Sequence, residues 1–246
     1  MRIVRLPSAD STNTYLRSLS PSPEEDMAVV ADCQTAGRGQ RGNSWEAEPG
    51  KNLTFSILFH PDRLPASEQF LLSCALSLAI TDILEEMIPA SSGKVRIKWP
   101  NDIYVDDQKI CGILIENSLC GKYIERSILG VGLNVNQKDF RSDAPNPVSI
   151  ALITGMEYDL PALLDRIVAA IGKRLAELDS PENKKEILPQ YISRLWRFNS
   201  VHTYELPDGT QFAGAITGIA PDGVMTITDT EGTLRHFLFK EVKFIL

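Results

Sequence analysis

The spacing of apolar and polar residues predicts strands and helices in the first four fifths of the chain, followed by strands alone. Runs of alternating or continuous apolar residues predict strands at 2–6, 27–31, 52–59, 95–99 and 128–136, and a hairpin at 103–116. Apolar residues at helical spacing predict helices over 67–87, 159–178 and roughly 182–195. The second of these has a single apolar stripe, which we interpret as core.

The pattern changes after the last predicted helix. From residue 198 to residue 246 short strands alternate with turns such as Pro207-Asp208-Gly209, Pro221-Asp222-Gly223 and Glu231-Gly232. Regular turns about 8–12 residues apart are typical of a small all-β barrel. We therefore expect two domains, covering residues 1–195 and 196–246.

Composition excludes several classes of protein. The chain has 246 residues with 43% hydrophobic and 23% charged residues, which indicates an ordinary soluble globular protein. Its net charge of −7 disfavours nucleic acid as the main partner, because phosphate neutralisation needs clustered Lys and Arg. No stretch of about 18 apolar residues and no signal peptide is visible, so we expect a cytoplasmic protein without a membrane association.

Cysteine and histidine usage argues against a zinc site. The four cysteines form no C-x-x-C pair, and the three histidines are widely scattered. We expect buried, reduced thiols. No Ser-His-Asp or Cys-His set is supported by spacing, so a covalent nucleophile is not the expected strategy.

The segment from Cys33 to Trp45 is the first candidate for chemistry. It follows a predicted buried strand and contains Gly37, Gly39 and Gly42 together with two arginines. Glycines let a backbone approach a ligand closely, and fixed cations suit a carboxylate or a phosphate. A plain surface turn is the alternative interpretation.

The glycine spacing brings three nucleotide-binding patterns into question, and the chain lacks further features that each of them requires. A Rossmann fingerprint needs a helix after the loop, but 43–50 contains Pro and Gly and has no helical period. A kinase loop would need His-Arg-Asp and Asp-Phe-Gly tripeptides, and a Walker loop would need Gly-Lys-Ser/Thr; all are absent.

Two further segments are polar in otherwise apolar surroundings. Residues 10–13 (Asp-Ser-Thr-Asn) either cap a helix or face a ligand from its N-terminus. Asp102 follows a proline corner and either forms a turn or serves a site, while Arg38, Arg41 and Lys98 or Lys109 offer cations. Gathered cations without an obvious base suit reactions driven by positioning and charge stabilisation, such as nucleotidyl transfer. These residues predict an acidic cytosolic α/β enzyme with an anion or nucleotide loop.

Several motifs taken together resemble one family. They are Gly37-Arg38-Gly39-x-x-Gly42-x-x-Trp45, Pro49-Gly50-x-Asn52-Leu53, Lys98-Trp99-Pro100-Asn101-Asp102, Lys109-x-x-Gly112-Ile113-Leu114-x-Glu116 and Gly130-x-Gly132-x-Asn134. In this order, with residues 10–13 and the β-rich tail, the chain resembles biotin protein ligase, also called biotin–[acetyl-CoA-carboxylase] ligase.

The resemblance implies a fold and an activity. The implied fold is α+β: a mixed β-sheet with helices on one face, of the class II aminoacyl-tRNA synthetase-like type, plus a small C-terminal SH3-like β-barrel. The implied activity is ATP-dependent: biotin and ATP give biotinyl-5′-AMP, and biotin then passes to one lysine of a biotin carboxyl carrier protein. ATP and Mg²⁺ are the implied cofactors.

The resemblance also assigns residues. Biotin contacts are implied for Ser11, Thr12, Asn13, Gln34, Gly37, Arg38, Gly39, Gln40, Lys109 and Gly112. ATP contacts are implied for Arg41, Trp45, Asn101 and Asn134. Catalytic roles are implied for Arg38, Lys109 and Asp102, where Asp102 is a metal ligand, a base or an orienter of the acceptor amine.

The chain departs from the family at two points. Gln40 stands where the family often has an arginine that helps to retain the adenylate, so that Arg41 compensates or the intermediate is held less tightly. Some relatives carry an N-terminal winged helix-turn-helix, whereas Met1 here opens onto the catalytic region; we expect no DNA binding. Relatives dimerise by sheet extension or remain monomeric, so a homodimer is one of two expectations.

Three alternatives remain at this level. A lipoate or octanoate protein ligase shares the implied architecture and differs in having a long apolar acyl pocket. A non-catalytic binding module would use the β-rich tail for peptide or RNA. A ligand-sensing repressor is disfavoured by the acidic charge.

Overall fold

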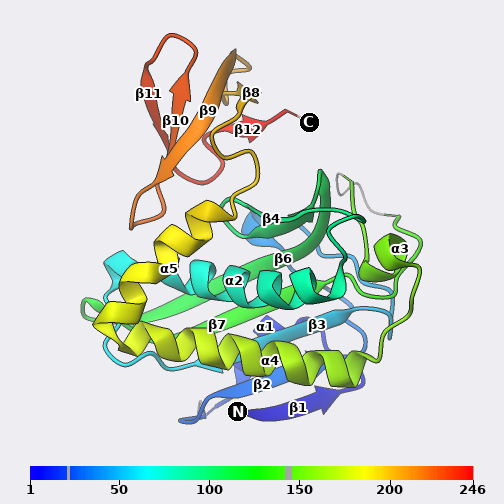
Figure 1. Ribbon diagram of the computed structural model, residues 1–246. Helices are drawn as coiled ribbons and strands as arrows, with labels where there is room; N and C mark the ends of the chain where they lie inside the picture. Colours follow the sequence, from blue (N-terminus) through cyan, green and yellow to red (C-terminus); the bar gives the residue numbers. More distant parts are fainter. Residues whose placement is uncertain (21–22, 142–145, 246) are drawn as a thin grey trace.

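The computed structural model describes residues 1–20, 23–141 and 146–245, with Arg41 described by its backbone only (Figure 1). The strands of the main sheet are β1 (Arg2–Leu6), β2 (Met27–Ala31), β3 (Leu53–Phe59), β4 (Val95–Lys98), β5 (Asp102–Val105), β6 (Gln108–Cys120) and β7 (Tyr123–Leu133). The α-helices are α1 (Thr12–Ser18), α2 (Phe70–Met87), α3 (Ile150–Thr154), α4 (Leu160–Ala176) and α5 (Pro181–Ser193). Short 3-10 turns cover Gln40–Gly42, Ala66–Glu68 and Glu177–Asp179.

The main sheet is mixed, as expected from the sequence. Its strand order is β1-β2-β3-β7-β6-β5-β4. The β1–β2 pair is parallel, whereas the pairs from β2 onward are antiparallel. The long hairpin of β6 and β7 therefore occupies the middle of the sheet.

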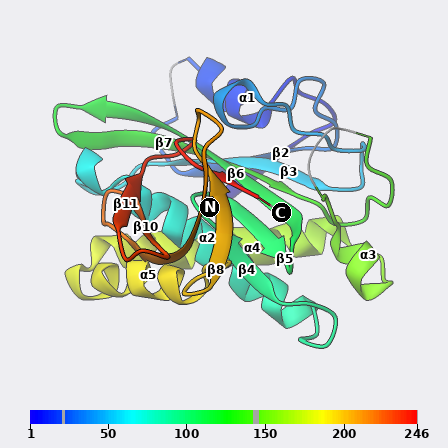
Figure 2. The same cartoon turned by 90° about the horizontal axis from the view of Figure 1, so that it is seen from above.

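Both faces of this sheet are covered. Along β2, Val29 packs with Leu16 of α1, and its neighbour Val30 belongs to the large core cluster that includes α2 and α4. Adjacent residues of a strand point to opposite faces, so α1 lies on the face opposite α2 and α4. Figure 2 shows α1 on one side of β2 and β3 and the longer helices on the other. The predicted helices on one face are α2 and α4; α1 adds a cover to the second face.

The two long helices follow from their sequences. Helix α2 is buried around most of its circumference, because it lies between the sheet and α4. Helix α4 buries the single stripe predicted from its spacing, and the Asp159 side chain accepts a hydrogen bond from the Ala162 amide at its start.

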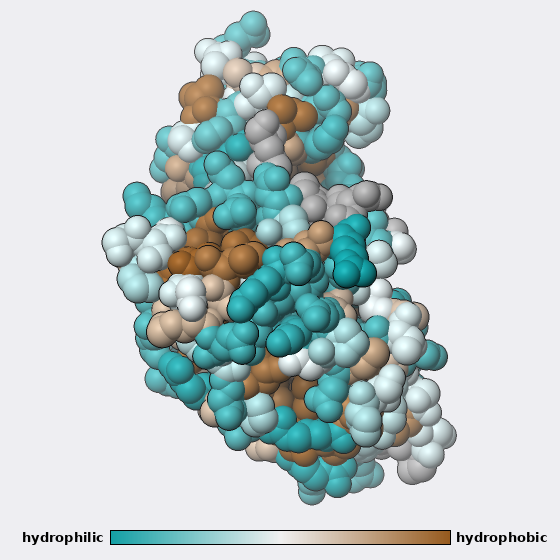
Figure 3. Space-filling model, turned by 90° about the vertical axis from the view of Figure 1, so that its right-hand side faces the viewer, coloured by the Kyte–Doolittle hydropathy of each residue, from teal (hydrophilic) through white to brown (hydrophobic). Residues whose placement is uncertain are grey.

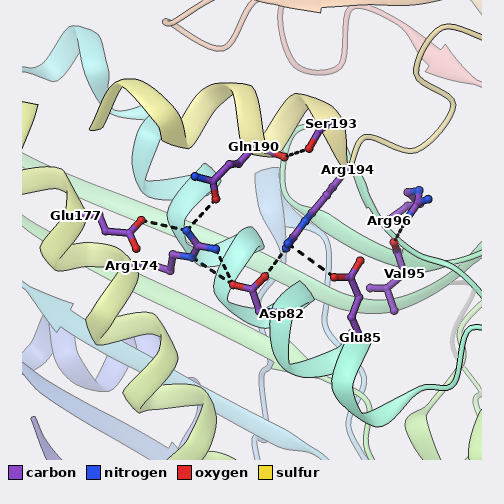
Figure 4. A network of polar contacts seen from close by, with 9 residues as sticks. All are labelled: Asp82, Glu85, Val95, Arg96, Arg174, Glu177, Gln190, Ser193 and Arg194. Atoms are coloured by element: carbon purple, nitrogen blue, oxygen red, sulfur yellow. Dashed lines mark hydrogen bonds and ion pairs between the residues drawn. The ribbon is translucent and has the colours of Figure 1, made fainter. Parts of the chain in front are cut away.

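A polar network ties the three packed helices together (Figure 4). Asp82 of α2 accepts hydrogen bonds from Arg174 of α4 at 2.8 Å and from Arg194, just after α5, at 2.5 Å. Arg174 also contacts Glu177 and Gln190. One carboxylate thus fixes the end of α5, where the chain leaves for its C-terminal part.

The C-terminal part forms a second, antiparallel sheet. Its strands are β8 (Val201–Glu205), β9 (Gln211–Ile219), β10 (Met225–Asp229), β11 (Leu234–Phe237) and β12 (Lys243–Phe244), in the order β11-β10-β9-β8-β12. Turn glycines at 209, 223 and 232 have positive φ, as the predicted turns require. This sheet is held to the main one by a hydrogen bond from Trp99 Nε1 to the Gly223 carbonyl at 2.9 Å.

The surface carries no continuous apolar band on the side shown in Figure 3, where hydrophobic residues gather in separate groups among hydrophilic ones. Within the described residues, none of the helices has the length and apolar character needed to cross a membrane.

Candidate functional site

A cavity of about 790 Å³ lies on the face of the main sheet that carries α1. Its walls come from the start of α1, from the loop after β2, from β5, β6 and β7, and from Phe239 in the tail. Residues from distant parts of the sequence therefore meet in one place.

The loop after β2 folds back on itself over the cavity. The Trp45 amide donates to the Gly37 carbonyl at 2.9 Å, and the Gly39 amide donates to the Asn43 carbonyl at 2.7 Å. These bonds form a small closed turn around the 3-10 turn Gln40–Gly42. The turn presents Arg38 and Trp45 to the cavity.

Glycines of β6 and β7 form the floor beneath two of the lining side chains. A Cβ on Gly132 would lie 2.3 Å from the Trp45 ring, and one on Gly112 would lie 2.9 Å from it. A Cβ on Gly130 would lie 2.3 Å from Asn13 Oδ1. Only glycine leaves room for these side chains to rest on the sheet.

Helix α1 contributes a polar network rather than a capped start. Ser11 occupies the N-cap position, but its side chain makes no capping hydrogen bond. The Thr12 amide donates to Gln34 Oε1 at 2.8 Å, and Thr12 Oγ1 contacts Ser56 Oγ at 2.6 Å. Ser56 Oγ in turn donates to Asn13 Oδ1 at 2.6 Å. Ser11, Thr12 and Asn13 line the cavity, whereas Asp10 accepts a hydrogen bond from Thr35 and does not; that residues 11–13 contact a ligand stays a prediction.

A second charged group joins the loop to the sheet. Glu116 of β6 accepts hydrogen bonds from Arg38 at 3.1 Å, from Asn13 at 2.8 Å and from Arg17. Partial burial alone would raise the pKa of Glu116, but the hydrogen bonds from Asn13 and Arg17 and the charges of Arg38 and Arg17 outweigh it, so the pKa lies below its ordinary value. Glu116 is therefore ionised at neutral pH.

Lys109 and Asp102 form an ion pair at the other end of the cavity. Lys109 Nζ lies 2.7 Å from Asp102 Oδ1 and 5.5 Å from the centre of the Trp45 ring. Asn101 is buried beside them and donates to the Ile113 carbonyl. A cation on a flexible stem can follow a charge that shifts between two bound anions.

Divalent metal binding here would need help from a ligand. Among the described side chains, no group of three or more His, Cys, Asp or Glu could hold a metal ion. Asp102 is a carboxylate that lines the cavity. Because Mg²⁺ is commonly held by one or two carboxylates plus substrate phosphates, Asp102 fits a metal that arrives with a nucleotide.

Lys98 is a further cation at the cavity wall. Its Nζ donates to Tyr104 Oη at 2.9 Å and lies 5.6 Å and 5.3 Å from the ring centres of Trp196 and Phe244. Burial lowers the pKa of Lys98, while the charge of Asp102 opposes that effect. Aromatic rings of the tail thus surround a lysine of the main sheet.

Two polar atoms of the wall have no hydrogen-bond partner among the residues that the structure describes. Asn134 Oδ1, an acceptor, and Trp45 Nε1, a donor, are both buried without a hydrogen bond. Both residues line the cavity. Buried polar atoms are nearly always paired, so these two point to a polar ligand.

A thiol nucleophile is not part of the arrangement. Cys111 lies beside Gly112 on β6 but is fully buried. Burial raises the pKa of the Cys111 thiol well above its ordinary value. The cavity can instead bind anions with its cations and a polar ring with its hydrogen-bonding groups.

The structure brings nearly all the predicted site residues together. The cavity is lined by Ser11, Thr12, Asn13, Gln34, Arg38, Gly39, Gln40, Trp45, Asn101, Asp102, Lys109, Gly112 and Asn134. Gly37 lines a smaller neighbouring pocket behind the loop. The side chain of Arg41 lies outside the described part of the chain, so its predicted ATP contact stays a prediction.

Sequence reasoning missed several residues of the site, of which four matter most for its geometry. Tyr104 and Phe239 line the cavity, and Ser56 and Glu116 support it from behind. Ser56 gave one signal, since it is a polar residue inside an apolar strand. Glu116 belonged to a family motif without an assigned role, and Phe239 gave no signal because it comes from the tail.

Comparisons with known proteins agree on one family. The family model described as "Biotin/lipoate A/B protein ligase family" matches residues 6–134. The chain is 33% identical over 196 residues to the bifunctional ligase/repressor BirA of Salmonella typhimurium, covering 78% of this chain and 57% of that protein. It is 32% identical over 181 residues to the biotin–[acetyl-CoA-carboxylase] ligase of Paracoccus denitrificans, covering 71% of this chain and 73% of that protein.

A solved structure shares the whole fold. The biotin protein ligase from Aquifex aeolicus in complex with biotin and ATP superposes with a TM-score of 0.80 at 26% identity, covering 99% of each chain. The bifunctional relatives are longer, and the matched region spans 57% of the Salmonella protein.

Proposed function

Because the chain belongs to the biotin/lipoate A/B protein ligase family, we propose that it is a biotin–protein ligase that uses ATP. The Paracoccus relative is named a biotin–[acetyl-CoA-carboxylase] ligase, and the Aquifex structure is a complex with biotin and ATP. The observation that carries the proposal is one cavity with uncharged hydrogen-bonding groups at α1 and cations at Arg38 and Lys109.

In the first step, a carboxylate oxygen of biotin attacks the α-phosphorus of ATP. The bond to the β-phosphate oxygen breaks, and biotinyl-5′-AMP and pyrophosphate form. Two anions must approach each other for this attack, and Arg38 and Lys109 lower the repulsion between them. Bound Mg²⁺, with Asp102 as its protein ligand, would neutralise phosphate charge.

In the second step, the ε-amine of an acceptor lysine attacks the carbonyl carbon of the adenylate. An amide bond forms, AMP leaves with the electron pair of the broken C–O bond, and the amine loses a proton. We propose a biotin carboxyl carrier domain as the acceptor. Asp102, next to Lys109, is one carboxylate of the cavity wall that can orient or deprotonate the amine.

The polar end of the cavity favours biotin over lipoate or octanoate. Burying the ureido ring of biotin requires donors and acceptors, whereas a long acyl chain requires an apolar tunnel. Thr12, Asn13 and Gln34 supply such donors and acceptors. We therefore assign their amides and hydroxyls to the ureido ring.

Biotin-dependent exchange between ATP and labelled pyrophosphate tests the proposal. Exchange is expected with biotin, and little or none with lipoate or octanoate. Lys109→Ala should lower the exchange rate on the order of 10²–10³-fold, as for loss of one charge-stabilising donor. Lys138→Ala, which breaks an exposed pair with Glu157, is the matched control and should leave the rate unchanged.

Two results would contradict the proposal. Exchange with lipoate but not with biotin would identify a lipoate ligase. A near wild-type rate in Lys109→Ala would remove this lysine from the chemistry.

A further inference from the structure

The charge of Glu116 determines which groups donate and which accept in the hydrogen-bond network behind the cavity. Asn13 Nδ2 lies 2.8 Å from Glu116 Oε2, and Asn13 Oδ1 lies 2.6 Å from Ser56 Oγ. An ionised carboxylate can only accept, so the Asn13 amide must present its NH₂ group to Glu116. Its oxygen then faces Ser56 and accepts.

This orientation uses up the hydrogen of Ser56. A hydroxyl has a single hydrogen, and Ser56 gives its own to Asn13 Oδ1. The 2.6 Å contact between Ser56 Oγ and Thr12 Oγ1 then requires Thr12 to be the donor. Thr12 has no hydrogen left for the cavity, so it can offer a ligand only the two lone pairs of its oxygen, which are acceptors.

Gln34 does not compete for the Thr12 hydrogen. Its Oε1 already accepts from the Thr12 amide at 2.8 Å, whereas its distance to Thr12 Oγ1 is 3.3 Å. The shorter contact, to Ser56, takes the hydroxyl hydrogen.

We propose that Glu116 and Ser56 are positioning residues that fix Thr12 Oγ1 as a hydrogen-bond acceptor and so select a ligand with an N–H group at that point. The inference rests on the proposed function, in which the N–H belongs to the ureido ring of biotin. Neither residue lines the main cavity: Ser56 is fully buried beneath α1, and Glu116 lines the pocket behind the loop. They act through Asn13 and Thr12.

The consequence is a preference between two nearly isosteric ligands. In a cyclic carbamate analogue of biotin, one ureido N–H is replaced by a ring oxygen. That oxygen would face the Thr12 lone pair, and two acceptors in contact leave both unsatisfied. From the usual loss for an unmade buried hydrogen bond, we expect wild-type protein to prefer biotin on the order of ten-fold or more.

The test compares dissociation constants for biotin and for the two carbamate analogues, measured by titration calorimetry on the full chain. In Ser56→Ala the Thr12 hydroxyl loses its partner at 2.6 Å and keeps only the longer contact to Gln34 Oε1 at 3.3 Å, so it can rotate and donate to a ligand acceptor, and the preference should fall to roughly two- to three-fold. Glu116→Gln, whose amide can also donate, leaves the Asn13 orientation fixed only by the weak bond from Asn13 Nδ2 to the Leu114 carbonyl at 3.4 Å, and should lower the preference less than Ser56→Ala does. Thr54→Val is the matched control: its hydroxyl, on the same strand, bonds the Ala31 carbonyl and lies outside the network.

A ratio of affinities separates orientation from stability, because a merely destabilising change weakens both ligands alike. Full preference in Ser56→Ala, or equal loss in Ser56→Ala and Thr54→Val, would overturn the inference while leaving the proposed function intact. Failure of wild-type protein to bind biotin at all would instead reject the proposed function.

Discussion

Gly132→Ala should lift the Trp45 indole off the sheet. The added Cβ would lie 2.3 Å, 2.5 Å and 2.8 Å from three atoms of the ring. Ordinary contacts between such atoms are about 3.5–4.0 Å, so the ring must retreat by roughly 1 Å or more. The backbone of Gly132 is held on both sides by β3 and β6, so the indole is the part that moves.

The magnitude follows from what Trp45 touches. Overpacking a buried site costs about 1–3 kcal/mol. Trp45 is only half-buried and belongs to a loop, so we place the loss of folding stability at about 1 kcal/mol. Substrate binding should weaken by a similar amount, and about 1 kcal/mol raises the dissociation constant about five-fold.

Urea unfolding followed by circular dichroism measures the first effect, and the biotin and ATP dependence of pyrophosphate exchange measures the second. Gly218→Ala is the matched control, since it is also a strand glycine but an added Cβ would meet no atom within 4 Å. It should change stability by less than about 0.5 kcal/mol. If Gly132→Ala matched this control in both assays, Trp45 would not rest on the sheet in solution.

Two further predictions concern charged groups. Asp82→Asn should lower the free energy of unfolding by about 1–2 kcal/mol, because Asp82 pairs with both Arg174 and Arg194. The control Glu86→Gln breaks one exposed pair and should change that free energy by less than about 0.5 kcal/mol. Equal effects of the two substitutions in urea unfolding would contradict this prediction. The pKa of Glu116 is lowered in the folded protein, so its stabilising effect is present at neutral pH and is lost as pH falls below about 4.5 through the folded pKa. The stability difference between wild type and Glu116→Gln should therefore shrink from pH 7 to pH 4, and a constant difference would show that the charge is not what stabilises.

The sequence predicts the bounds of a helix where residues of that segment alone determine where it begins and ends. Helix α4 was predicted from its apolar stripe, and it begins beside the capping Asp159. The helix expected from residue 67 begins at Phe70, because Ala66–Glu68 forms a separate 3-10 turn after Pro65. Strand β7 begins at Tyr123, earlier than expected, since its pairing with β6 continues into the hairpin.

Site residues that belong to contiguous sequence motifs were predictable. Site residues whose role depends on contacts between distant parts of the chain were not. The loop from Cys33 to Trp45 and the segment around Asp102 both reached the cavity. Ser56 gains its importance from Asn13, which lies 43 residues away in the chain. Phe239 reaches the cavity only because two sheets pack together, and no spacing in the sequence encodes that.

The attachment of the tail has a consequence for how such proteins can be recombined. Phe239 completes the cavity from the segment between β11 and β12, and Trp99 fastens the tail through the Gly223 carbonyl at 2.9 Å. A tail borrowed from a relative would bring its own substitute for Phe239 against an unchanged remainder. Chimeras joined between α5 and β8 should therefore have the ligand affinity of neither parent. Substitutions on the two sides of the contact between the tail and the main sheet should occur together during evolution.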